Sequence, residues 1–115
     1  METSLTLGLL KKIESQDLMV PFIEQLNKDA HLAGLEIKFE TNLSSAQLVG
    51  DLYQILLQLI TADFGGYLNY LYRIDVPERA MQSIIDSEPE SIIKQVTYLV
   101  LKREWQKVSL RNKIR

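Results

Sequence analysis

The sequence contains no cysteine and only one histidine, His31, among its 115 residues. The lack of cysteine excludes a disulfide framework and a thiolate metal site. A single histidine is too few for the zinc sites that proteins build from several nitrogen or sulfur ligands. His31 is expected near a helix end, where its charge would favour the helix dipole. A chain without cysteine suits a reducing compartment, so we expect a cytoplasmic protein. The sequence also has no cofactor-binding motif, so we expect no metal and no other cofactor.

Long apolar runs are missing as well. Every apolar stretch falls well short of the ~20 residues that a helix needs to span a bilayer. The leucine-rich stretch that ends at Leu10 follows Glu2 and precedes Lys11 and Lys12. A signal peptide has the opposite order of charges, so we expect neither a secretion signal nor a membrane segment.

The composition that remains is typical of one globular domain. Hydrophobic residues make up 46% of the chain and charged residues 24%, which is enough apolar material for a core. The charge is unevenly distributed, because residues 102–115 hold six basic residues and one acidic residue, against seven and fourteen in the rest. We expect a single helical domain over residues 1–115, with 110–115 as a frayed basic tail.

Helical spacing of apolar residues dominates the chain. Together with helix start and stop signals, it predicts helices over residues 4–16, 17–33, 45–74, 76–85 and 88–109. Gly34 is placed to end the second helix, since glycine accepts the left-handed conformation of a helix stop. Three pairs have capping-box spacing and predict the starts of the last three helices: Ser44 with Gln47, Asp75 with Glu78, and Ser87 with Glu90.

Residues 35–40 follow a different period. Leu35, Ile37 and Phe39 alternate with charged residues, which predicts a half-buried extended segment. Its backbone groups need partners. It could pack on helices, pair with residues 4–10, or pair with its own copy in a dimer. The predicted fold is therefore all-α or nearly so: a small bundle of four to five helices around a long central helix, with one short extended segment.

The predicted central helix over 45–74 is apolar over an unusually wide arc. At ~100° per residue, its apolar positions cover roughly 220° of the circumference. A surface helix needs an apolar stripe of only about 100°. The helix must be covered on more than one side, either by the fold or by a second copy. We therefore predict a non-enzymatic interaction protein that self-associates as a symmetric dimer.

Asp63 falls inside this apolar arc. A carboxylate there must be paired, protonated or in contact with water. Arg73 is the candidate partner for a buried ion pair, and Arg79 or Arg103 could also serve. Asp63 could instead cap a helix that restarts near Gly65–Gly66, a pair that predicts a kink, a break or a close backbone approach. If the protein is an enzyme, a pocket of Asp63 and nearby tyrosines is its expected site, although no catalytic residue is assigned.

The basic end of the chain supports an alternative function. Lysine and arginine side chains on the last helix could contact the phosphates of a nucleic acid. The candidates are Lys102, Arg103, Lys107, Arg111 and Lys113. The acidic body argues against this alternative, and cations near a helix C-terminus are favoured by the dipole in any case.

Two segments carry a resemblance to known sequences. Residues 71–78 read Leu-Tyr-Arg-Ile-Asp-Val-Pro-Glu, and residues 103–107 read Arg-Glu-Trp-Gln-Lys. This pattern resembles a group of small uncharacterised bacterial proteins, mainly of the Bacteroidota, with an LYRIDV-x-E segment and an R-x-x-Q-K helix end. The chain departs from the group at Pro77, where serine is expected, and at Gly65–Gly66. The resemblance implies a bacterial, cytosolic, helical protein and transfers no functional residue.

Overall fold

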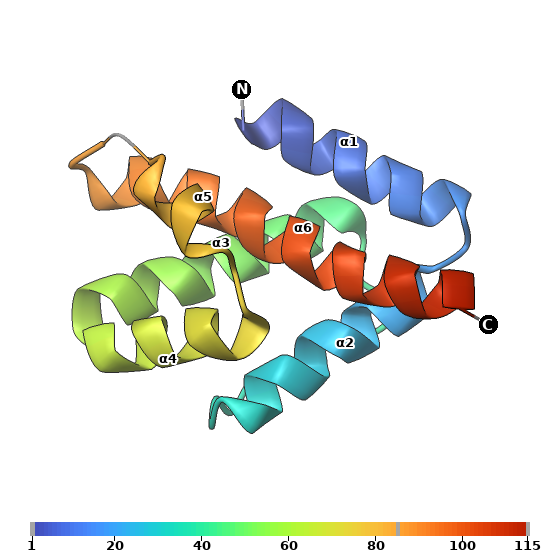
Figure 1. Cartoon of the computed structure of the whole chain (residues 1–115), viewed down its shortest axis with the longest axis horizontal. Helices are drawn as coiled ribbons and strands as arrows, with labels where there is room; N and C mark the ends of the chain where they lie inside the picture. Colours follow the sequence, from blue (N-terminus) through green and yellow to red (C-terminus); the bar gives the residue numbers. More distant parts are fainter. Residues whose placement is uncertain (1, 85, 115) are drawn as a thin grey trace.

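The computed structural model describes residues 2–84 and 86–114, and every regular element in them is a helix. The all-α prediction is therefore confirmed. The structure is a small helical bundle (Figure 1). Across the described residues no helix is both long and apolar enough to cross a lipid bilayer. In chain order the helices are α1 (Glu2–Ser15), α2 (Met19–Leu32), α3 (Ser45–Ala62), α4 (Phe64–Ile74), α5 (Glu78–Gln82) and α6 (Pro89–Ile114).

The central element of the bundle is α6, not the segment 45–74. Helix α6 crosses the middle of the molecule and packs against α1, α2, α3 and α4 (Figure 1). Helix α3 packs against α1, α4 and α6 and buries Leu48, Leu52 and Leu56 completely. The wide apolar arc predicted for residues 45–74 is therefore covered largely by other helices of the same chain.

The predicted long helix is broken in two at Asp63. This residue leaves the helical conformation, with φ −149° and ψ 74°, and its carboxylate accepts a hydrogen bond of 3.0 Å from the backbone N–H of Gly66. A Cβ on Gly66 would stand 2.5 Å from Asp63 Oδ2, so the glycine provides the space for the cap. The chain then reverses, and α4 lies beside α3 (Figure 1).

One of the three predicted capping boxes forms. The side chain of Ser44 accepts from the backbone N–H of Gln47, and Gln47 Oε1 accepts from the Ser44 N–H at 3.1 Å. Asp75 instead adopts the left-handed conformation, with φ 69°, and ends α4. Asp86 replaces Ser87 before α6, because its carboxylate accepts from the N–H groups of Ser87 and Glu88 and from the Ser91 hydroxyl. These bonds, first that of Ser91, lower the pKa of Asp86.

The last helix is longer than predicted, since its end was expected at residue 109. Helix α6 continues to Ile114, and residue 115 lies outside the described residues. Two contacts explain the difference: Val108 is buried in the core, and Arg111 donates a hydrogen bond to Gln25 of α2. The last turns of α6 are therefore held by α2.

Residues 35–40 form the extended connector between α2 and α3. The side chain of Asn27 pairs with both backbone groups of Phe39, donating to its carbonyl at 2.9 Å and accepting from its N–H at 2.7 Å. Phe39 is buried, whereas Glu36 and Lys38 are exposed, as the alternation predicts. Pairing with residues 4–10 is excluded because those residues belong to α1. The connector therefore packs on helices.

Asn27→Ala is expected to lower the free energy of unfolding by about 2 kcal/mol, because it leaves two partly buried backbone groups without their partner. Urea denaturation measures this loss. Asn112→Ala is the matched control: Asn112 is exposed on α6, so its replacement changes only helix propensity. Equal stabilities of the two variants would contradict the role of Asn27.

Candidate functional site

A fully buried carboxyl group lies on the central helix. The Glu104 side chain has no exposed surface, and neither of its oxygens has a hydrogen-bond partner among the described residues. The cation beside it is Lys107, whose Nζ lies 3.5 Å from Oε1. An unpaired carboxylate in such a place is strongly disfavoured, so the group must be protonated or compensated.

A second buried carboxylate, Asp29 of α2, faces the same region. Lys107 Nζ lies 2.7 Å from Asp29 Oδ2, and Gln25 Nε2 donates to the same oxygen at 3.1 Å. Gln25 Oε1 in turn accepts from Arg111 Nη1 at 2.5 Å. We call these five residues, Gln25, Asp29, Glu104, Lys107 and Arg111, the carboxyl cluster. It joins α2 to α6.

The pKa values of the two carboxyl groups are shifted in opposite directions. Burial raises the pKa of Glu104 to about 9, helped by the neighbouring Asp29 and opposed by Lys107. Burial would also raise the pKa of Asp29, but the neighbouring Glu104, the bonds with Lys107 and Gln25 and the Lys107 charge outweigh it and lower that pKa. Both directions agree with the geometry, because Lys107 Nζ lies closer to Asp29, at 2.7 Å, than to Glu104, at 3.5 Å, and Glu104 is the more deeply buried of the two.

Tyr70 of α4 is a third buried titratable residue near the carboxyl cluster. Burial, and then the charges of Glu104 and Asp29, raise the pKa of its hydroxyl, so Tyr70 stays neutral. Because Glu104 is completely buried and Asp29 is 4% exposed, no substrate in solvent can touch the pair as it stands. The two carboxyl groups are therefore closed to solvent and are not arranged as an open acid–base site.

The predicted site residues Asp63 and Arg73 do not form a buried ion pair. Both are exposed, and neither takes part in any ion pair between described residues. The break at Asp63 explains the difference, because it removes the residue from the helical wheel that placed it inside the apolar arc. The alternative prediction, a cap for a restarted helix, describes what Asp63 does. His31 is exposed in the last turn of α2, as expected.

The basic residues of α6 are mostly engaged within the chain. Arg103 donates to the Asp75 carbonyl at 3.0 Å and pairs with its carboxylate at 3.4 Å. Lys107 and Arg111 belong to the carboxyl cluster, and Lys102 Nζ lies 5.9 Å from the centre of the Tyr98 ring. Of the five candidates for polyanion contact, only Lys113 is exposed and has a side chain that forms no ion pair, hydrogen bond or ring contact with another described residue. The Arg103–Asp75 contact joins the end of α4 to α6.

An apolar row is exposed on α4. Phe64, Leu68 and Tyr72 are 56%, 51% and 85% exposed, and their spacing of four places them on one ridge of the helix. The Phe64 ring stacks on Tyr67, which is buried, with the ring centres 5.7 Å apart. We call these three exposed residues the α4 row. The opposite side of α4, with Tyr70, Leu71 and Ile74, is buried.

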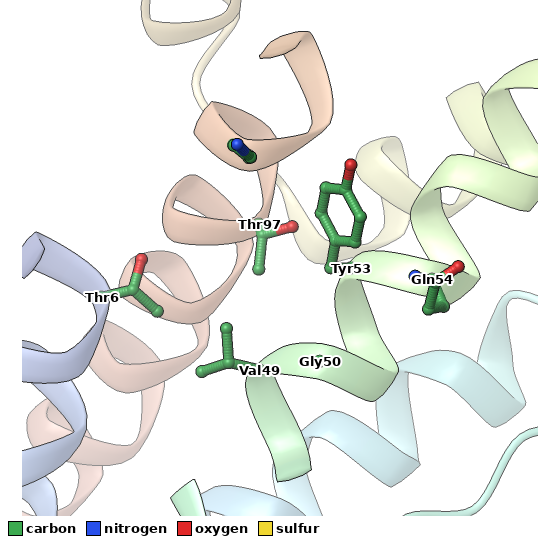
Figure 2. Close-up of a pocket in the computed structure, with 7 residues that line it drawn as sticks. Thr6, Val49, Gly50, Tyr53, Gln54 and Thr97 are labelled. Atoms are coloured by element: carbon green, nitrogen blue, oxygen red, sulfur yellow. The ribbon is translucent and has the colours of Figure 1, made fainter. Parts of the chain in front are cut away.

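A cavity of about 250 Å³ opens between α1, α3 and α6. Figure 2 shows the side chain of Val49 at its base, Thr6 and Thr97 on one side and the ring of Tyr53 on the other. Thr97 is buried and donates its hydroxyl to the Ile93 carbonyl at 2.7 Å. The complete lining is Thr6, Val49, Gly50, Tyr53, Gln54, Lys94 and Thr97.

Comparisons of the chain with protein-family models, with curated proteins and with solved structures gave no match. Within the residues that the structure describes, no three histidine, cysteine, aspartate or glutamate side chains are grouped to hold a metal ion. A functional assignment therefore has to come from the surfaces and clusters of the chain itself.

Proposed function

We propose that this protein is a cytoplasmic, non-enzymatic interaction protein that self-associates as a symmetric dimer through the α4 row. The observation that carries the proposal is the exposure of three large apolar side chains on one ridge of a single helix. Scattered apolar residues on a surface are ordinary, whereas a contiguous apolar row is typical of an interaction site.

The order of residues in the row favours a second copy as the partner. An aromatic residue stands four positions before Leu68 and another stands four positions after it. In an antiparallel pair of α4 helices related by a two-fold axis at Leu68, Leu68 packs on its own copy. Phe64 then packs on Tyr72 of the second copy, twice. Such self-complementarity is what an isologous interface requires, and each aromatic pair contributes about 1 kcal/mol beyond burial.

The interface is expected to be small. Helix α4 has 11 residues, so it is about 16 Å long at ~1.5 Å per residue. Contact along a helix of that length lies at the low end of the interface sizes seen for specific complexes. We therefore expect a reversible dimer with a Kd of tens of micromolar, or ~6 kcal/mol of binding free energy.

Leu68→Glu is expected to abolish the dimer, because two like charges would meet at the two-fold axis in a desolvated contact. Sedimentation equilibrium over a range of about 10 to 300 μM measures the monomer–dimer equilibrium around the expected Kd. The matched control is Leu110→Glu, since Leu110 is 62% exposed on α6 and outside the α4 row.

The control variant should dimerise like the wild type, and Tyr72→Ser should weaken the dimer about tenfold through the loss of two aromatic contacts. A wild-type chain that stays monomeric over the whole range would refute self-association. A dimer that tolerates Leu68→Glu but not Leu110→Glu would refute the α4 row as its interface.

A further inference from the structure

We propose that the cavity between α1, α3 and α6 is a binding site for a small monocarboxylate with an apolar body. The site shares no residue with the α4 row, so the proposal stands or falls independently of the dimer. Three features of the lining support it: a glycine that the packing does not require, an apolar interior, and an unpaired cation.

Gly50 is the first feature. Glycine inside a helix is unfavourable relative to alanine, and Gly50 lies within α3 with a regular helical neighbourhood on both sides. A Cβ built on it meets no atom within 4 Å, so no contact within the chain demands a glycine there. What the missing side chain leaves is open space at the wall of the cavity. We infer that glycine at position 50 keeps this side of the cavity open to a ligand.

The interior of the cavity is mainly apolar. Val49 points into it, and the Tyr53 ring forms a flat wall (Figure 2). The hydroxyl of Thr97 already donates its proton to the Ile93 carbonyl, so toward a ligand it can only accept a hydrogen bond. Such walls bind hydrocarbon through the removal of apolar surface from water.

Lys94 supplies the charge. It is the one formally charged residue in the lining, and it forms no ion pair with any described residue. The half-buried Tyr53 and the exposed Gln54 add hydrogen-bonding groups beside the cavity. An anionic head group is therefore the complement of this lining, while a cation would meet the lysine charge without compensation.

The size of the cavity limits the ligand. A cavity of about 150 Å³ holds one benzene, so about 250 Å³ holds a molecule of roughly ten non-hydrogen atoms. Octanoate and phenylacetate both have this size and represent an aliphatic and an aromatic body. Ligands this small are expected to bind with a Kd of about 1 mM or below.

The test is a titration of the full chain with octanoate, phenylacetate and uncharged octanol, followed by amide chemical shifts. Gly50→Leu is expected to weaken all three at least tenfold, because the new side chain fills the cavity. Gly8→Leu is the matched control: Gly8 is also a helical glycine with nothing within 4 Å of a Cβ, but it is not part of the lining. That variant should bind like the wild type.

Lys94→Gln separates the charge from the apolar cavity. It should weaken the two carboxylates about fivefold and leave octanol unchanged, whereas Lys28→Gln, at an exposed position of α2, should change nothing. Preference for phenylacetate would identify an aromatic acid, and preference for octanoate an aliphatic one. Absence of saturable shifts at about 10 mM, ten times the expected Kd, would overturn the proposal. Equal binding by Gly50→Leu and the wild type would overturn it too.

Discussion

Lys107→Met is expected to lower the free energy of unfolding at neutral pH by about 3 kcal/mol, as the removal of one partner from a buried ion pair does. The reason is the position of Asp29, whose side chain is 6% exposed and whose carboxylate depends on Lys107 Nζ at 2.7 Å. Methionine keeps most of the length of lysine and removes the charge. Urea denaturation measures the loss.

Two further variants separate the buried charge from other effects of the substitution. Lys102→Met removes an exposed cation from the same helix, so it should cost less than about 0.5 kcal/mol. The double variant Asp29→Asn with Lys107→Met should recover most of the lost stability, because asparagine leaves no uncompensated charge in the core. If Lys107→Met were as stable as Lys102→Met, the carboxyl cluster would not hold α2 to α6.

The features of the fold that could be predicted from the sequence are local ones. The Ser44–Gln47 box, the positive φ of Gly34 and the alternation over residues 35–40 each depend on residues within a few positions of one another. Such signals report directly on backbone geometry. Most helix boundaries were therefore predicted to within a few residues.

The break at Asp63 shows where local signals fail. The apolar spacing continues across residues 45–74, so periodicity alone predicts one helix. The chain folds back instead, and α4 then packs on both α3 and α6. Asp75 and Ser87 do not serve as the predicted N-caps. Asp75 ends α4 in the left-handed conformation instead, and the Asp86 carboxylate accepts from the backbone N–H groups before α6. Tertiary packing decides between such alternatives.

The carboxyl cluster was missed for two separate reasons. Asp29 and Lys107 are 78 positions apart, and no local pattern relates them. Glu104, by contrast, gave a readable signal, since it falls on the row of Val100 and Val108 at helical spacing. The reasoning that singled out Asp63, a carboxylate among apolar positions, applies to Glu104 with more force, because α6 is unbroken there.

Glu104→Gln is expected to make the protein more stable than the wild type near pH 9 and similar to it near pH 5. The unfolded chain releases the Glu104 proton around its ordinary pKa of 4.5, whereas the folded chain keeps it up to about 9. Between these values the folded state binds more protons, so wild-type stability falls as pH rises. The slope attributable to this group is at most ~1.4 kcal/mol per pH unit.

Glutamine has the shape of the protonated acid and no proton to lose, so it should remove this slope. Asp29 does not affect this comparison. Because its pKa is lowered from 3.8, its own effect on the pH dependence of stability falls below pH 3.8, outside the range in which Glu104 acts. Glu88→Gln, at an exposed position, is the control and should follow the wild type.

Urea denaturation of the three proteins at several pH values gives the comparison, and the difference between two profiles cancels every group that they share. A Glu104→Gln profile parallel to that of the wild type would mean that the buried carboxyl is ionised at neutral pH. Such an ionised Glu104 would stand beside an ionised Asp29 with Lys107 as the cation between them, and the core would then hold two negative charges against one.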